Sequence, residues 1–299
     1  MAYQLQEINK RVQANTEEFL AECDQAYAQR VSLAADKILE NLERSPIVLL
    51  SGPSGSGKTT TALKIAEELQ RRGVGSRAVA MDNYFKTMNR RTAPRTPEGD
   101  IDYESPLCMD MDLLSEHFTA LSRGDWVLVP KFEFARQMRN DSLGTPLKLE
   151  KNDIAGRHPE ATKLYISARS NVNEGSSLRF KGTWMRLIRR AVRDYNFRGT
   201  EVADTLEMWA NVRRGEKLYI SPFKHRADII FDSSLPYEVS VMKNYAVPIL
   251  QSVPEDNERH DELLQLIDAF SHFEPIDPAL VPKDSLLREF IGGGSYKYH

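Results

Sequence analysis

Apolar positions along this chain form two kinds of pattern, short continuous runs and longer stretches with helical spacing. Residues 47–50 are all apolar, which is typical of a buried strand, and residues 61–69 place Leu63, Ala66 and Leu69 on one side of a helix. Such an alternation of strands and helices indicates an α/β fold. Further strands are predicted at 77–81, 126–130, 163–166 and 227–232, and helices at 111–121, 184–195 and 237–272, the last broken near Pro254.

The first 44 residues are charged and apolar at helical spacing. Val31, Leu33, Ala34, Ile38 and Leu42 predict one face of a helix that leads into the first strand. We interpret residues 1–44 as an N-terminal helical extension that packs on the following domain. A dimerisation arm is an alternative without specific support in the sequence, so a homo-oligomer stays open. The glycines at 292–294 predict a flexible tail.

Between the first strand and the first long helix lies a glycine-rich segment, residues 51–60, that matches G-x-x-x-x-G-K-[ST] in full. Glycines let the backbone curl so that several N–H groups point at one anion, and the helix that follows adds its positive end. A flexible linker with a stray Gly-Lys-Thr is the alternative, but both flanks agree with a phosphate-binding loop. The predicted ATP-binding residues are Gly52, Ser54, Gly55, Ser56, Gly57, Lys58, Thr59 and Thr60.

Two members of this loop have chemical roles that follow from their side chains. The Lys58 ammonium can reach the outer phosphates of the nucleotide, and the Thr59 hydroxyl can bind Mg²⁺. ATP and Mg²⁺ are therefore the expected cofactors.

Composition excludes several other classes of protein. The chain has 299 residues, 41% of them hydrophobic, and a formal net charge of −3, which gives no support to a nucleic-acid binder. No apolar run approaches the roughly 18 residues that span a membrane, and the N-terminus has no apolar signal core. Cys23 and Cys108 lie far apart and in no ligand-like spacing. We therefore expect a cytoplasmic protein without disulfides or zinc.

Asp82 follows the predicted strand at 77–81, at the edge where an open α/β sheet binds ligands. It can accept a proton from a substrate hydroxyl or hold a metal-bound water, and a helix N-cap is an equally good interpretation of its position. Asp232, at the end of the predicted strand 227–232, is a weaker candidate for a metal ligand. The polar segment 86–106 between predicted elements is typical of a mobile loop.

The helix at 184–195 has an apolar face and, beside it, a basic stripe. Trp184, Leu187, Ile188, Ala191, Val192 and Tyr195 form the apolar face. A charged stripe is usually a solvated face, but beside a bound triphosphate it can act as a lid over the transferring group. The stripe consists of Arg186, Arg189, Arg190 and Arg193.

From about residue 47 to 250 the chain resembles the uridine kinase and phosphoribulokinase family of P-loop kinases, in particular its bacterial uridine kinase-like branch. The resemblance depends on motifs that occur in a fixed order. They are the glycine-rich loop, Asp82-Asn83-Tyr84-Phe85, Tyr103-Glu104-Ser105-Pro106, Pro130-Lys131-Phe132-Glu133-Phe134, and the arginines from Arg186 to Arg198. It implies a three-layer α/β/α fold with a mostly parallel central sheet, a substrate hairpin and an arginine-bearing lid helix. It also implies that residues 45–252 form the kinase domain and that residues 253–299 form a C-terminal helix and tail packed on it.

The resemblance also implies roles for single residues. Asp82 matches the catalytic acid of the family, and Lys58, Arg193 and Arg198 match groups that meet the ATP phosphates. The expected substrate contacts are Tyr84, Tyr103, Glu104, Phe132, Phe134 and Arg190.

The sequence departs from the family at several positions. Gln137 stands where nucleoside-specific members have a histidine, Phe132 replaces a tyrosine, and Thr200 replaces an arginine. The family's strand ending in a Mg²⁺-binding glutamate has no counterpart between Ile154 and Ala155. Either the sequence omits a segment here or the protein has lost a central strand. We favour omission, because loss of a central strand would expose two ladder edges.

These features predict an ATP-dependent kinase of a small hydroxyl acceptor, with a nucleoside as the expected substrate. An alternative acceptor is a sugar phosphate or another metabolite. A different class remains open as well, a regulatory or RNA-associated protein that binds ATP and hydrolyses it slowly or not at all.

Overall fold

The structure is a computed structural model of the 299-residue chain, and it describes residues 2–133, 136–148 and 161–297. Within these ranges, no helix is long and apolar enough to cross a membrane.

The central sheet consists of three parallel strands, β2 (Val48–Ser51), β5 (Thr162–Ser167) and β8 (Ile229–Asp232). Their order is β2-β5-β8, so β5 lies in the middle and pairs with both neighbours. Leu164 and Ile166 of β5 are almost completely buried, as the apolar run predicts. The strands predicted at 47–50, 163–166 and 227–232 are therefore confirmed.

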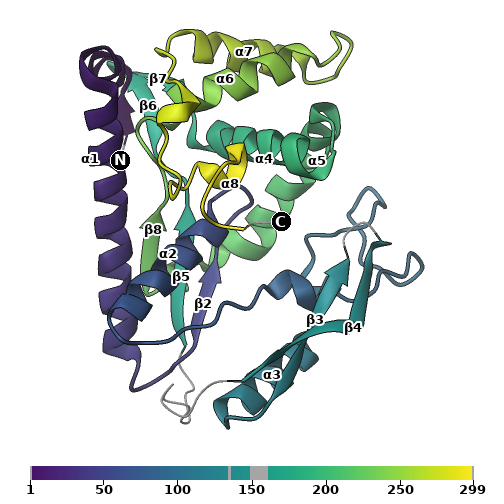
Figure 1. The fold of residues 1–299 in the computed structure, drawn as a ribbon. Coiled ribbons are helices and arrows are strands. Elements are labelled where there is room, and N and C mark those ends of the chain that lie inside the picture. Colours follow the sequence, from purple (N-terminus) through teal and green to yellow (C-terminus); the bar gives the residue numbers. More distant parts are fainter. Residues whose placement is uncertain (1, 134–135, 149–160, 298–299) are drawn as a thin grey trace.

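Helices surround this sheet and bury their apolar faces in one large core (Figure 1). The long helix α1 (Leu5–Asn41) runs beside β8 and contacts α2 (Lys58–Arg71), the helix that follows the glycine-rich loop. The other large helices are α4 (Gly182–Arg198), α5 (Val202–Gly215), α6 (Glu238–Gln251) and α7 (His260–Ser271). An α/β fold with a parallel sheet, as predicted, is confirmed.

The two predicted helical faces differ from the structure at their ends. On α1, Val31, Ala34 and Ile38 are buried, but Leu33 is 64% exposed and points away from the core. On α4, the apolar face is buried except for Trp184, which is partly buried, and Tyr195, which is 46% exposed. The helices at 111–121 and 237–272 are found at the expected places, and the second is broken between α6 and α7.

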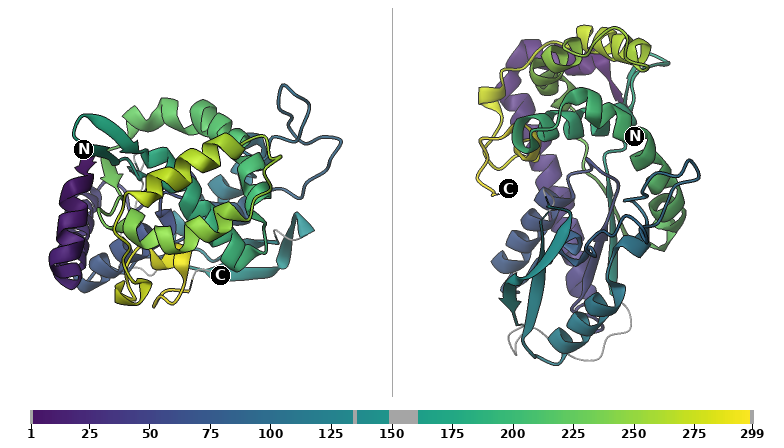
Figure 2. Two further views of the ribbon diagram at one scale, coloured as in Figure 1. Left: turned by 90° about the horizontal axis from the view of Figure 1, so that it is seen from above. Right: turned by 90° about the vertical axis from the view of Figure 1, so that its right-hand side faces the viewer.

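A smaller lobe lies at one end of the molecule, as Figures 1 and 2 show. It contains α3 (Met111–Ser122) and the antiparallel hairpin of β3 (Val127–Glu133) and β4 (Met138–Leu147). Its own small core includes Tyr84 and Leu114. The predicted hairpin is confirmed.

Several elements have no counterpart among the predictions. A second sheet, of order β1-β6-β7, joins the N-terminus to a hairpin in the middle of the chain. Its strands are β1 (Ala2–Gln4), β6 (Asn171–Glu174) and β7 (Ser177–Phe180), and the short α8 (Arg288–Ile291) lies near the C-terminus. Short helical turns occur at Met81–Tyr84, Pro106–Cys108, Glu216–Ile220, Ser221–Arg226 and Pro278–Leu280.

The predicted strand at 77–81 is wrong. Residues 74–80 form no regular structure, and a 3₁₀ turn begins at Met81. A strand exists only where another strand accepts and donates its hydrogen bonds, and no described strand pairs with this segment. Asp82 therefore lies in a 3₁₀ turn and not at the end of a strand.

The glycine-rich tail is also more ordered than its composition predicts. The Ser295 N–H donates to the Lys283 carbonyl at 2.8 Å, and the Arg288 guanidinium donates to the Gly292 carbonyl at 3.2 Å. The predicted omission between Ile154 and Ala155 lies outside the described residues. In the part of the chain that the structure describes, β2 is an edge strand of the central sheet.

Candidate active site

The glycine-rich loop passes so close to other backbone that three of its positions require glycine. A Cβ atom on Gly52 would lie 2.1 Å from the Ile166 carbonyl oxygen, and one on Gly55 would lie 2.5 Å from the Arg186 carbonyl oxygen. Gly57 has φ 74°, a left-handed conformation that favours glycine. The loop therefore lies directly over β5 and against α4.

The amide groups of this loop form an anion cradle at the N-terminus of α2. Among the described residues, the N–H groups of Gly55, Gly57, Lys58 and Thr59 have no hydrogen-bond partner. The Thr59 side chain is exposed beside them. Unpaired amides at a helix N-terminus, next to an accessible hydroxyl, fit a nucleotide polyphosphate with its Mg²⁺.

Lys58 folds back over its own loop. Its Nζ donates to the carbonyls of Gly52 at 2.9 Å and Pro53 at 3.1 Å. Burial lowers the pKa of Lys58, and the carboxylates of Asp82 and Glu289 oppose this shift. Asp82 therefore lies close enough to the cradle for its charge to act on the lysine.

A carboxylate from the C-terminal segment also reaches the cradle. Glu289 accepts hydrogen bonds from the Thr60 N–H at 3.1 Å and from the Thr60 hydroxyl at 2.5 Å. A Cβ atom on Gly57 would lie 2.5 Å from a methyl group of Leu286. The segment around α8 thus packs on the first turn of α2, a contact that no local sequence signal indicates.

The predicted base, Asp82, lies within electrostatic range of Lys58. Asp82 is exposed, and its carboxylate makes no hydrogen bond to any described residue. Glu104 lies nearby and packs on α5, where a Cβ atom on Gly215 would meet its side chain at 2.3 Å. Burial raises the pKa of Glu104, while Arg190 lowers it and the charges of Lys58 and Asp82 also act on it.

Three predicted arginines converge on one buried acid. Arg190, Arg193 and Arg198 pair with Asp194 at 3.3, 2.7 and 3.3 Å. Arg190 also donates to the Ser54 hydroxyl in the loop at 3.1 Å. Asp194 therefore holds the three guanidinium groups together on the side of α4 that faces the loop.

The other two arginines of the basic stripe are buried, so a solvated face is the wrong interpretation for them. Arg186 pairs with Glu216 at 3.0 Å, and Arg189 pairs with Glu238, both away from solvent. Buried arginines are tolerated because these acids neutralise them.

The expected aromatic contacts divide into different environments. Tyr84 is 1% exposed and its hydroxyl lies 3.0 Å from Nδ1 of His117, so it belongs to the core of the lobe and is not an accessible substrate contact. Phe132 is buried, with its ring 5.5 Å from that of Phe85. Tyr103 is 52% exposed. Phe134 lies outside the described residues.

Hydrogen bonds from neighbouring groups occupy the carboxylate of Asp232, the weaker candidate for a metal ligand. Its carboxylate accepts hydrogen bonds from the Arg169 N–H at 3.2 Å, the Ser170 hydroxyl at 3.1 Å and the Ser234 hydroxyl at 2.6 Å. Burial alone would raise the pKa of Asp232, but these hydrogen bonds lower it below its ordinary value. Among the described residues, no three His, Cys, Asp or Glu side chains gather as metal ligands.

The geometry defines a class of protein first. A parallel strand, a glycine-rich loop with a partly buried lysine, and a helix whose first amides are free, close to an acid and clustered arginines, are the parts of a phosphate-binding loop of the P-loop type. The model of the Phosphoribulokinase / Uridine kinase family matches residues 47–159. The resemblance of this chain to that family is therefore confirmed.

Two curated proteins and one solved structure are similar to this chain. Uridine kinase of Staphylococcus haemolyticus is 26% identical over 212 residues, which cover 67% of this chain and 93% of the relative. Uridine kinase of Anoxybacillus flavithermus is 26% identical over 230 residues, which cover 72% of this chain and 99% of the relative. A solved structure of a putative fructose transport system kinase from Silicibacter is 21% identical with a TM-score of 0.43. The match covers 67% of this chain and 98% of that structure.

Proposed function

We propose that this protein transfers the γ-phosphoryl group of ATP to a hydroxyl group of a small acceptor, with a nucleoside as the leading candidate. The observation that carries the proposal is the anion cradle with Lys58, because the Asp82 carboxylate lies close enough for its charge to act on that lysine. We take residues 45–252 as the catalytic unit, flanked by 1–44 and 253–299, although one core contains residues from all three.

Each group has a defined role in this proposal. The free amides and Lys58 bind the phosphates, and the Thr59 hydroxyl would hold Mg²⁺, which neutralises phosphate charge when bound. Asp82 carries no competing hydrogen bond from the described residues, so its carboxylate can orient and deprotonate the acceptor hydroxyl. Arg193 and Arg198, held by Asp194, stabilise the charge that develops on the transferred group.

The nucleoside assignment has support and opposition. The curated relatives named uridine kinase favour it. Two departures oppose it: Gln137, exposed in the hairpin turn with φ 51°, replaces the family's base-reading histidine, and Thr200 replaces a substrate arginine. A sugar phosphate or another small alcohol is therefore the second candidate acceptor.

The test is a panel of nucleosides, sugars and sugar phosphates, assayed by acceptor-dependent ADP release. We expect one acceptor class to stimulate ADP release in the wild type. Lys58→Ala should lose ATP binding and turnover, whereas Asp82→Asn should lose turnover and retain most of its ATP affinity. Asp112→Asn, an exposed acid on α3, is the matched control and should behave as wild type. ATP binding without stimulation by any acceptor would favour a regulatory protein instead.

A further inference from the structure

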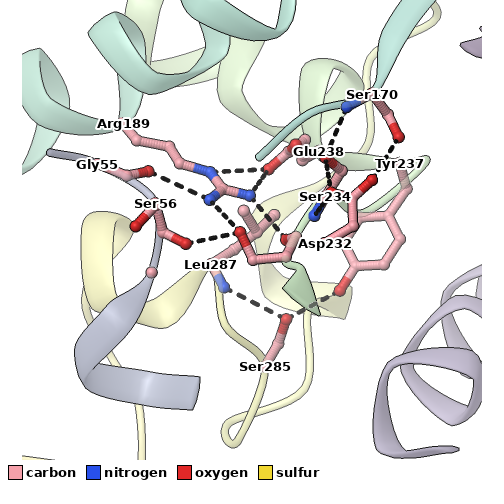
Figure 3. Close-up of polar contacts among 12 residues, drawn as sticks. Gly55, Ser56, Ser170, Arg189, Asp232, Ser234, Tyr237, Glu238, Ser285 and Leu287 are labelled. Carbon is pink, nitrogen blue, oxygen red and sulfur yellow. Dashed lines mark hydrogen bonds and ion pairs between the residues drawn. The ribbon is translucent and has the colours of Figure 1, made fainter. Parts of the chain in front are cut away.

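Behind the glycine-rich loop lies a buried polar brace, shown in Figure 3. Its centre is Arg189 of α4, which is fully buried and bound to the Glu238 carboxylate, with Nε at 3.0 Å. The same guanidinium donates to the Gly55 carbonyl at 3.2 Å and to the Ser233 carbonyl at 3.1 Å. The brace therefore ties the loop to the turn between β8 and α6.

Ser233 makes the shortest contact between this turn and the loop. Its hydroxyl donates to the Ser56 carbonyl at 2.6 Å and lies 3.4 Å from Nη1 of Arg189. Ser233 is completely buried, so water cannot replace it in this hydrogen bond.

This hydrogen bond fixes the direction of the Gly57 N–H, a group that can donate a hydrogen bond to a phosphate. The Ser56 carbonyl shares its peptide plane with the Gly57 N–H, and in a trans peptide the two groups point in opposite directions. The structure has no cis peptide bonds among the described residues. When Ser233 holds the carbonyl inward, the Gly57 N–H must point outward, into the anion cradle.

A peptide plane beside a glycine needs such a restraint. Gly57 can adopt many backbone conformations at little cost, so the plane could rotate and turn its N–H away from the phosphates. The Gly57 carbonyl is held separately, because it accepts from the Thr61 N–H at 3.1 Å and the Thr61 hydroxyl at 2.8 Å. On the other side of Gly57, the Ser56 carbonyl accepts a hydrogen bond from Ser233 alone among the residues that the structure describes.

We propose that Ser233 is a positioning residue for nucleotide binding, and that Arg189 and Glu238 hold it in place. The inference rests on the proposed function, since the ligand it serves is the polyphosphate of the nucleotide. Ser233 touches neither nucleotide nor acceptor; it acts through the Gly57 amide.

The test is equilibrium binding of ATP and of adenosine to Ser233→Ala, with no acceptor present. Loss of one restraining hydrogen bond should weaken ATP binding about three- to tenfold and leave adenosine binding unchanged, because adenosine carries no phosphate. The matched control is Ser240→Ala, a buried serine of α6 whose hydroxyl has no partner among the described residues. Ser240→Ala should bind both ligands as the wild type does.

A second variant keeps the inference testable if Ser233→Ala fails to fold. Ser233→Cys retains a weak donor, so its loss of ATP affinity should fall between those of wild type and Ser233→Ala. Wild-type ATP affinity in the folded Ala or Cys variant, or equal losses for ATP and adenosine, would overturn the inference. A wild type that binds ATP but phosphorylates no acceptor would refute the proposed function alone.

Discussion

Asp24, a partly buried acid of α1, should make the stability of this protein depend on pH. One of its oxygens accepts a hydrogen bond from the Tyr237 hydroxyl at 2.8 Å, and the other is buried without a partner among the described residues. Tyr237 also lies 2.8 Å from the Ser285 hydroxyl, so the acid sits where α1, α6 and the C-terminal segment meet. Burial raises the pKa of Asp24 from its ordinary 3.8 to about 6.

The size of the effect follows from this shift. About two pKa units correspond to at most ~3 kcal/mol, and partial solvent contact reduces the expected value to ~1–2 kcal/mol. Between pH 4 and 6 the folded protein holds a proton that the unfolded chain releases, so stability falls as pH rises through this window. Above pH 6 the Asp24 carboxyl is ionised in the folded protein too, and the loss of stability no longer grows with pH. Asp24→Asn removes the charge and should stabilise the protein there.

The assay is urea unfolding of wild type and Asp24→Asn at pH 4 and pH 7.5. We expect Asp24→Asn to have the larger free energy of unfolding by ~1–2 kcal/mol at pH 7.5 and nearly the same value as wild type at pH 4. Glu17→Gln, on an exposed part of the same helix, is the control and should show no such difference. If Asp24→Asn is equally or less stable than wild type at pH 7.5, the reasoning is refuted.

Three further substitutions test the site. Gly57→Ala should cost ~1–3 kcal/mol of stability and most of the ATP affinity, because φ is 74° and the new Cβ would meet Leu286. A wild-type ATP affinity of this variant, measured by titration calorimetry, would contradict this. Asp194→Asn should lower kcat about tenfold by releasing three arginines, with unchanged circular dichroism; an unaltered kcat would count against their role. Asp102 pairs with Arg214 at 2.8 Å and accepts from the N–H of the predicted substrate residue Glu104 at 3.2 Å. Asp102→Asn should therefore raise the acceptor KM while ATP affinity stays constant, and the reverse pattern would contradict this.

The features that sequence predicts here are those with short-range causes. The glycine-rich loop, its strand and its helix are contiguous, so the motif determines local backbone shape and the free amides together. The helix pattern at 184–195 identified α4 for the same reason. The hairpin at β3 and β4 also depends on neighbouring segments.

The features that sequence did not predict depend on contacts between distant positions. The strand expected at 77–81 has apolar residues but no partner strand, which composition cannot reveal. Glu289 reaches Thr60 across 229 positions, and Arg189 meets Glu238 across 49. Tyr84 belongs to the motif Asp82-Asn83-Tyr84-Phe85, yet tertiary packing places its side chain in the core of the smaller lobe.

The central claim concerns the destination of one phosphoryl group. The most direct measurement follows labelled γ-phosphate from ATP into products, for wild type and for Asp82→Asn, with the acceptor that the panel selects. We expect label in a phosphorylated acceptor with the wild type and almost none with Asp82→Asn, although the variant still binds ATP. Label found only in inorganic phosphate, or equal transfer by both proteins, would contradict it.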